Sequence, residues 1–208
     1  MTHGPAHPRV FQANIDRLFR GVISPSLAGL PIHEALETGE AASLDRFLDR
    51  AAAIVDNHTA NEAAKAYALV LAAVFERQLR IWGRSLGVTV EKRRPGYEPF
   101  DLYLAACAEA QTLDLNDRNL GQTLNELFLV ANVFRHGDGG SLTALRTRAP
   151  QFWHYAPTRY IDLSPPGPDQ SERLLIGPND ITRYAGACVR FWGLADKGDF
   201  ATAEPPYG

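Results

Sequence analysis

The residues best suited to chemistry in this chain are Asn132, Arg135 and His136, which lie within five positions of one another. Asn132 and His136 are four residues apart, so on an α-helix their side chains share one face, one turn from each other. An imidazole can exchange protons near neutral pH, and an amide can orient it or donate a hydrogen bond to a phosphate. A guanidinium group is a cation suited to phosphate charge. These three residue types together mark the place in the sequence where polar chemistry is most plausible.

These side chains belong to an apolar segment whose pattern predicts a helix. Its core-facing residues recur at helical spacing and are Leu120, Leu124, Leu127, Ala131 and Phe134. Gly137 is suited to the left-handed conformation that often ends a helix, and residues 138–140 continue as a loop. We therefore expect His136 at the exposed mouth of an otherwise buried helix. A purely structural role is the alternative, because a cationic residue in the last turn complements the negative end of the helix dipole.

The run from Glu126 to Arg146, followed by Pro150, resembles the signature segment of the HEPN superfamily. The motif of that superfamily is an Arg, usually a polar residue such as Asn, and a His a few residues later. Asn132 and His136 fall on the polar and His positions of the motif. Ala131 stands where the motif has its Arg.

Upstream, the run Phe75-Glu76-Arg77-Gln78-Leu79 resembles the first long helix of the HEPN fold, so the resemblance covers roughly residues 60 to 150. The resemblance implies an all-α domain and, where the motif is intact, a metal-independent ribonuclease that uses no cofactor. Such proteins are often toxins or phage-defence effectors. The partners that it implies are RNA, a second protomer whose motif shares the cleft, and an antitoxin or other defence-system protein.

Two functions remain open because Ala131 replaces the motif Arg. The first is an RNA-cleaving effector that uses His136, Asn132 and possible help from Arg135 in a homodimer. Arg135 lies about 100° around the helix from His136, so we expect it to replace the motif Arg only if the dimer geometry differs. The second is a non-catalytic HEPN-like module that binds a nucleotide, a nucleic acid or a protein partner.

Two groups of basic residues are candidates for contact with a nucleic-acid backbone. They are Arg77, Arg80 and Arg84, three and four residues apart on one helical face, and the consecutive Lys92, Arg93 and Arg94 in a connecting turn. An ordinary solvated surface is the alternative for both groups. The formal net charge of the chain is −3, which argues against a general electrostatic grip on nucleic acid. Any such affinity must therefore come from these local clusters.

The chain as a whole has the length and composition of one compact, globular domain. Its 208 residues suffice for a substantial core, and no run approaches the roughly 18 apolar residues of a membrane span. The N-terminus lacks the basic and apolar regions of a secretory signal, which favours a cytoplasmic protein without membrane contact. Cys107 and Cys188 lie far apart in apolar helical contexts, so we expect reduced core thiols, with a disulfide as the alternative. No Cys/His pattern indicates a metal site.

Helical periodicity predicts an all-α fold, an up-and-down helical bundle with a short irregular or β-hairpin arm near residues 150–178. Three parts of this domain are expected: residues 1–42 as an N-terminal tail and short helix, 43–148 as the HEPN-like bundle, and 149–208 as a Pro- and aromatic-rich arm, a C-terminal helix and a tail. If the arm is a hairpin, residues 159–163 pair with 173–176.

Capping and breaking residues predict where the helices begin and end. Ser24-Pro25 is expected to end the first helix, and Asn57-His58 to end a second helix that Ser43 caps. That second helix carries the apolar residues Leu44, Phe47, Leu48, Ala51, Ile54 and Val55. Thr59-Ala60-Asn61-Glu62 then indicates a capping box at the start of a separate helix over residues 60–86. The caps predicted for the later helices are Asp114 or Asn116, Ser141 and Asn179.

Overall fold

A computed structural model of the protein describes residues 7–90, 99–164, 170–199 and 201–204. Every regular element in these residues is a helix, which confirms the all-α prediction. The α-helices are α1 (His7–Leu18), α2 (Ser24–Ala28), α3 (Leu44–Ser85), α4 (Phe100–Ala110), α5 (Leu120–His136), α6 (Gly140–Arg148) and α7 (Pro178–Ala195). The π-helix η1 (Phe19–Ile23) and the short 3-10 helices η2 (Asp117–Asn119), η3 (Pro150–Trp153) and η4 (Ser171–Arg173) complete the set. In the described residues no helix combines the length and apolar character that a bilayer span requires.

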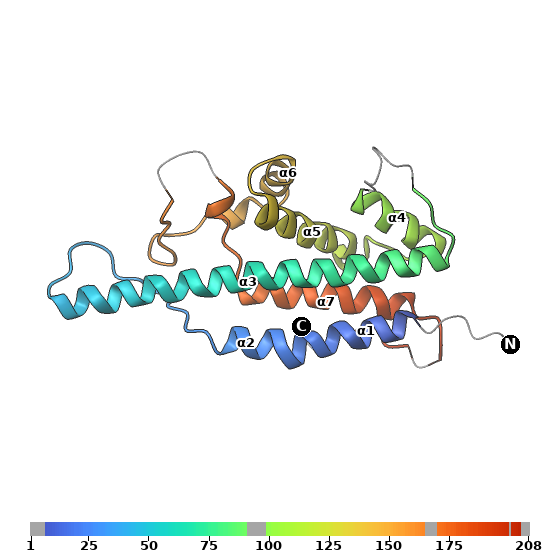
Figure 1. Ribbon diagram of the computed structural model, residues 1–208, viewed down its shortest axis with the longest axis horizontal. Helices are drawn as coiled ribbons and strands as arrows, with labels where there is room; N and C mark the ends of the chain where they lie inside the picture. The colour runs from blue at the N-terminus through green and yellow to red at the C-terminus, as the bar shows by residue number, and fades with distance from the viewer. Residues whose placement is uncertain (1–6, 91–98, 165–169, 200, 205–208) are drawn as a thin grey trace.

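The helix α3 is the axis of the molecule. Figure 1 shows it spanning the whole length, with α7 and then α1 and α2 on one side and α4, α5 and α6 on the other. The core lies where α3, α5 and α7 meet. Aromatic rings interlock there, with centroid distances of 5.2 Å between Phe75 and Phe191 and 5.4 Å between Trp82 and Trp192. Edge-on packing of this kind is favourable for aromatic pairs, so these rings tie α3 to α7.

The two cysteines are free and buried in this core, as predicted. Cys107 lies on α4 and Cys188 on α7. Burial raises the pKa of the Cys107 thiol to about 11 and raises the pKa of the Cys188 thiol as well. Both side chains therefore act as small apolar groups rather than as nucleophiles.

The helix break predicted at Asn57-His58 is wrong, because α3 runs without interruption for 42 residues. Its start is as predicted. Ser43 has extended backbone angles, and its Oγ accepts a hydrogen bond from the N–H of Arg46 at 3.3 Å. This is the geometry of an N-cap that satisfies one of the free amides of a first turn.

The capping box predicted at residues 59–62 is also wrong. Thr59 lies inside α3, and its hydroxyl donates to the carbonyl oxygen of Val55 at 2.9 Å. Glu62 instead accepts from Lys65 Nζ at 2.8 Å, one turn further along. A Thr hydroxyl in a helix interior commonly bonds back to the carbonyl four residues earlier, so this residue type does not by itself mark a helix start.

The chain also continues as a helix through Ser24-Pro25, where an end was predicted. The π-helix η1 accounts for this continuation, since the N–H of Ser24 bonds to the carbonyl of Phe19, five residues earlier. Pro25 then occupies the first turn of α2. At that position its missing N–H and fixed backbone angle are tolerated.

The caps predicted for the last three long helices are wrong. These helices begin after other residues, namely Asn119, Gly139 and Gly177 rather than Asp114 or Asn116, Ser141 and Asn179. At the start of α7 the carboxylate of Asp180 accepts a hydrogen bond from the N–H of Gly177 at 3.0 Å. The three helices are present as predicted. Their first residues depend on the geometry of the preceding turns, which the capping preferences of single residues do not specify.

Residues 149–177 form the irregular alternative of the predicted arm, since their described part contains no strand. The hairpin pairing of 159–163 with 173–176 is not formed. The N–H of Leu175 bonds instead to the carbonyl of Phe152 at 3.0 Å, and the N–H of Ile176 bonds to the side chain of Asn61 on α3 at 2.9 Å. The arm is therefore held by the middle of α3.

Candidate functional site

The predicted residues Asn132, Arg135 and His136 lie in the last turns of α5. Gly137 ends the helix with φ of 70°, and its N–H bonds to the carbonyl of Val133 at 2.8 Å. A left-handed φ is strained for residues with a Cβ, which explains why a glycine ends the helix here. Arg135 and His136 are exposed, and Asn132 is half-buried.

The side chain of Arg135 connects the other two residues. Its Nε donates to His136 Nε2 at 2.9 Å, and its Nη2 donates to Asn132 Oδ1 at 3.2 Å. The long side chain thus spans the angle that separates it from His136 on the helix. A ring nitrogen that accepts a hydrogen bond carries no proton, so in this arrangement the proton of the neutral imidazole is on Nδ1.

This cluster, which we call the α5 cluster (Asn132, Arg135 and His136), can supply three chemical roles. The lone pair of His136 Nε2 can accept a proton when the guanidinium moves to another acceptor. The guanidinium can stabilise negative charge on a phosphoryl group, and the amide can hold either partner in place. Because the cluster is on the surface, a large substrate can reach it.

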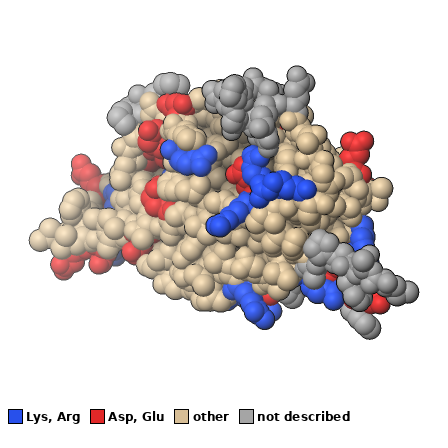
Figure 2. All heavy atoms as spheres, turned by 45° about the vertical axis from the view of Figure 1, so that its right-hand side comes forward, with Lys and Arg blue, Asp and Glu red and all other residues tan. Residues whose placement is uncertain are grey.

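The two predicted basic groups have different surroundings. Arg80 is engaged by Glu76, with Nη2 to Oε1 at 2.8 Å, and its guanidinium lies 5.3 Å from the ring centroid of Tyr103. Arg77 and Arg84 are exposed. Lys92, Arg93 and Arg94 lie outside the described residues. On the face shown in Figure 2, Lys and Arg side chains form small groups separated by uncharged and acidic ones.

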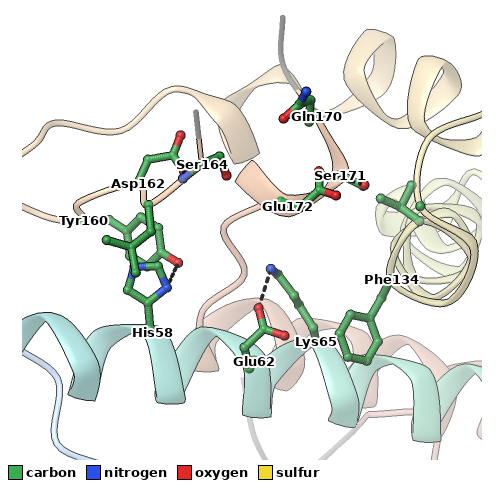
Figure 3. Close-up of a pocket in the computed structure, with 13 residues that line it drawn as sticks. His58, Glu62, Lys65, Phe134, Tyr160, Asp162, Ser164, Gln170, Ser171 and Glu172 are labelled. Atoms are coloured by element: carbon green, nitrogen blue, oxygen red, sulfur yellow. Dashed lines mark hydrogen bonds and ion pairs between the residues drawn. The ribbon is translucent and has the colours of Figure 1, made fainter. Parts of the chain in front are cut away.

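A pocket of about 680 Å³ lies between the middle of α3, the end of α5 and the arm (Figure 3). Its lining residues are His58, Glu62 and Lys65 of α3, Val133, Phe134 and Gly137 at the end of α5, and Tyr160, Asp162, Leu163, Ser164, Gln170, Ser171 and Glu172 of the arm. The α5 cluster does not line this pocket. The pocket and the α5 cluster therefore lie at the same end of α5 but on different sides of that helix.

Lys65 is the buried cation of this pocket. Its side chain is only 4% exposed, and its Nζ lies 2.8 Å from Oε1 of the exposed Glu62. Figure 3 shows the ammonium group pointing up from α3 into the pocket. A buried ammonium is costly unless it is paired, and it has three N–H donors to satisfy. Lys65 can therefore bind an anionic or carbonyl oxygen from a ligand as well as Glu62.

His58 and Tyr160 form the second polar element of the pocket wall. His58 Nε2 donates to the carbonyl of Ile161 at 2.8 Å, and His58 Nδ1 accepts from the hydroxyl of Tyr160 at 2.8 Å. The same hydroxyl accepts from Asn61 Nδ2 at 3.1 Å. Burial raises the pKa of Tyr160 to about 12, so its hydroxyl stays neutral and can donate to the ring. The network is satisfied and fixes the arm against α3.

Asp162 joins two parts of the arm, residues 160–164 and the segment around Arg173. Its carboxylate forms an ion pair with Arg173 and accepts from the N–H of Ser164 at 2.9 Å. Burial works against ionisation of Asp162, but the hydrogen bonds from Ser164 and Arg173 outweigh it and hold the pKa below its usual value. The pocket wall formed by residues 160–164 is thus stabilised by a charged contact.

Sequence reasoning did not find this pocket. One signal was present: Lys65 continues a polar line that Asn57 and Asn61 form at four-residue spacing along an otherwise apolar helix, and of the three it is Lys65 that lines the pocket. All three residues are buried. Interpreting Asn57 and Asn61 as parts of helix ends hid that line. In the described residues, no group of three or more His, Cys, Asp or Glu side chains is placed to hold a metal ion.

Comparison of the chain with models of known protein families, with curated proteins and with solved structures gives no match.

Proposed function

We propose that this chain is a HEPN-like, metal-independent endoribonuclease of a toxin or phage-defence system, with the α5 cluster as its catalytic site. The observation that carries the proposal is the contact of one exposed guanidinium with both His136 and Asn132. Arg135 would thereby supply, from the position before the His, the cation that the resemblance places at Ala131. Exposure of the ring removes the main physical objection, since a walled-off imidazole could not reach RNA.

The reaction would be transesterification at one phosphodiester. An RNA phosphate draws the Arg135 guanidinium away from His136, which frees Nε2 to accept the proton of the ribose 2′-hydroxyl. The 2′-oxygen attacks phosphorus, the bond from phosphorus to the 5′-oxygen breaks, and the leaving oxygen takes a proton from an acid. In a homodimer a second, protonated copy of His136 would be that acid. The products carry a 2′,3′-cyclic phosphate and a 5′-hydroxyl.

Basic residues further along α3, a partner protein and the cell compartment complete the proposal. Arg77 and Arg84 are exposed and would contact the RNA backbone, whereas Arg80 is engaged by Glu76 and would not. An antitoxin or other defence protein would be the physiological partner. Buried, free thiols fit a reducing compartment such as the cytoplasm.

The test is incubation of labelled RNA with the purified protein in EDTA. We expect cleavage to cyclic phosphate ends, and a loss of about 10²-fold or more on His136→Ala, which is typical for removal of a general base. Arg135→Ala should reduce the rate while Arg135→Lys restores part of it, because the group acts through its charge. His154→Ala, which removes an exposed His elsewhere, is the matched control and should cleave normally. Cleavage that survives His136→Ala would exclude this site.

The second candidate function is a non-catalytic module that binds a small ligand, and the pocket around Lys65 favours it. A buried ammonium directed into about 680 Å³ of space is suited to the phosphate of a nucleotide. Titration with a nucleoside monophosphate, followed by a thermal-shift measurement, tests this function. Stabilisation that is lost in Lys65→Met, together with equal inertness of wild type and His136→Ala towards RNA, would support the module over the enzyme.

A further inference from the structure

The first half of α3 has an apolar face that no other part of the described chain covers. Figure 1 shows this half projecting beyond the helices that pack on the rest of α3. Its large apolar side chains are more than half exposed, with fractions of 71% for Leu44, 57% for Phe47, 54% for Leu48 and 62% for Val55. We call these four residues the outer face. Contiguous exposed apolar side chains of this size commonly mark a binding surface.

The spacing of the outer face suits a partner helix. Three residues of the outer face, Leu44, Leu48 and Val55, form one stripe along the helix together with Ala51, at separations of four, three and four residues. This is the spacing of a seam that receives the side chains of a second helix. Ala51, in the middle of the stripe, is small enough to let another helix approach closely.

The chain itself already covers the opposite side of this half of α3. Arg46 Nη1 pairs with Glu37 at 2.9 Å, His33 Nε2 lies 2.9 Å from Asp56, and Arg50 donates to the carbonyl of Gly39. The segment before α3 thus binds the polar side of the helix and leaves the apolar side open. This half of α3 is therefore covered on its polar side, and the outer face is the side that stays exposed.

The net charge of the projecting part of the chain, on both sides of the helix, defines the chemistry of the partner. Residues 34–62 contain seven acidic and two basic side chains, a net charge of −5 against −3 for the whole chain. The two basic residues, Arg46 and Arg50, are bound to Glu37 and Gly39 within the chain. Asp45 is exposed beside the stripe, and Asp49 is exposed on the side that the segment before α3 covers. Figure 2 shows acidic side chains spaced along this projecting part of the molecule, at the left of the view.

A second copy of the chain is a poor occupant, because pairing two such surfaces would bring together two segments that each carry a net charge of −5. We propose that the outer face binds an amphipathic helix of a partner protein whose apolar side is bordered by Lys and Arg. Leu44, Phe47, Leu48 and Val55 bury the apolar side of that helix. Asp45, beside the stripe, and the net negative charge of residues 34–62 select its basic borders. The proposal does not depend on the ribonuclease activity.

The test uses two synthetic helical peptides with the same Leu-rich face, one bordered by Lys and Arg and the other by Glu. Fluorescence anisotropy should show that the basic peptide binds the full chain and that the acidic one does not. The double variant Leu48→Asp, Val55→Asp should weaken binding of the basic peptide at least tenfold. Val10→Asp, Val22→Asp is the matched control, since both residues are at least half exposed elsewhere, and it should bind like the wild type.

A charge-reversal variant keeps the proposal testable if the apolar variant is misfolded. Asp45→Lys, Asp49→Lys leaves the outer face intact and should shift the preference towards the acidic peptide. Equal binding of both peptides, no binding of either, or no effect of the outer-face variants would overturn the proposal. A wild-type dimer in light scattering that Leu48→Asp, Val55→Asp converts to monomer would also overturn it, because a second copy would then be the occupant.

Discussion

The two halves of α3 have similar apolar periodicity, but the apolar side chains of one half are buried and those of the other half are exposed. In the second half Leu71, Phe75 and Leu79 are at most 1% exposed, whereas in the first half Phe47 and Leu48 are more than 50% exposed. The difference lies in the neighbours, because α5 and α7 pack on the second half alone (Figure 1). Periodicity therefore tells which face of a helix is apolar, but not whether the same chain covers it.

The boundary between the halves is a pair of buried asparagines. Asn57 accepts from the N–H of His33 and donates to its carbonyl, both at 2.8 Å. One turn later, Asn61 accepts from the N–H of Ile176 at 2.9 Å and donates to the carbonyl of Leu174 at 3.1 Å. These side chains act as substitutes for backbone partners that an irregular segment lacks. They attach the segment before α3 and the arm to one point on the helix.

The largest expected effect contrasts one phenylalanine in each half. Phe75→Ala should lower the free energy of unfolding by about 3–5 kcal/mol, because it removes a buried ring and leaves a cavity. Phe47→Ala should change it by no more than about 0.5 kcal/mol, as is usual for an exposed site. Urea denaturation followed by circular dichroism measures both. A loss of several kcal/mol in Phe47→Ala would show that the first half of α3 is packed after all, and the comparison would fail.

A smaller effect is expected at the boundary. Asn61→Ala should lower the free energy of unfolding by about 1–3 kcal/mol, because it leaves the buried N–H of Ile176 without a partner. Hydrogen exchange of the Ile176 amide should become faster than in the wild type. Asn132→Ala is the control: its amide bonds only to exposed Arg135 in the described residues, and little stability should be lost. Unchanged exchange at Ile176 would mean that the arm does not depend on this side chain.

The smallest effect concerns the charge that stabilises the arm. The pKa of Asp162 is lowered in the folded protein, so its ionised form adds stability above its ordinary pKa of about 4, and this stability is lost as the pH falls through the lower folded value. Asp162→Asn should cost about 1 kcal/mol at pH 7, and the difference from wild type should narrow below about pH 4. Glu37→Gln, which removes an exposed ion pair, should show almost no effect.

The sequence predicted the α5 cluster better than it predicted the pocket. Helical spacing placed Asn132 and His136 on one face, and Gly137 marked the helix end. The contact of Arg135 with His136 was not foreseen, because helical angle describes the Cβ direction and not the reach of a long side chain. The pocket could not be foreseen, since it joins His58 and Lys65 to arm residues about 100 positions away.

By itself the sequence determined the all-α class, the start of α3 at Ser43, the end of α5 at Gly137 and the burial of both cysteines, because each depends on local pattern or composition. The tertiary structure alone decided that Asn57 and Asn61 lie inside one continuous helix. Their side chains can cap a helix or bond to a distant backbone with equal ease, and only the packed arm shows which partner is present. The outer face is a second case. The sequence shows that its residues are apolar, but only the tertiary structure shows that no other part of the described chain packs against them.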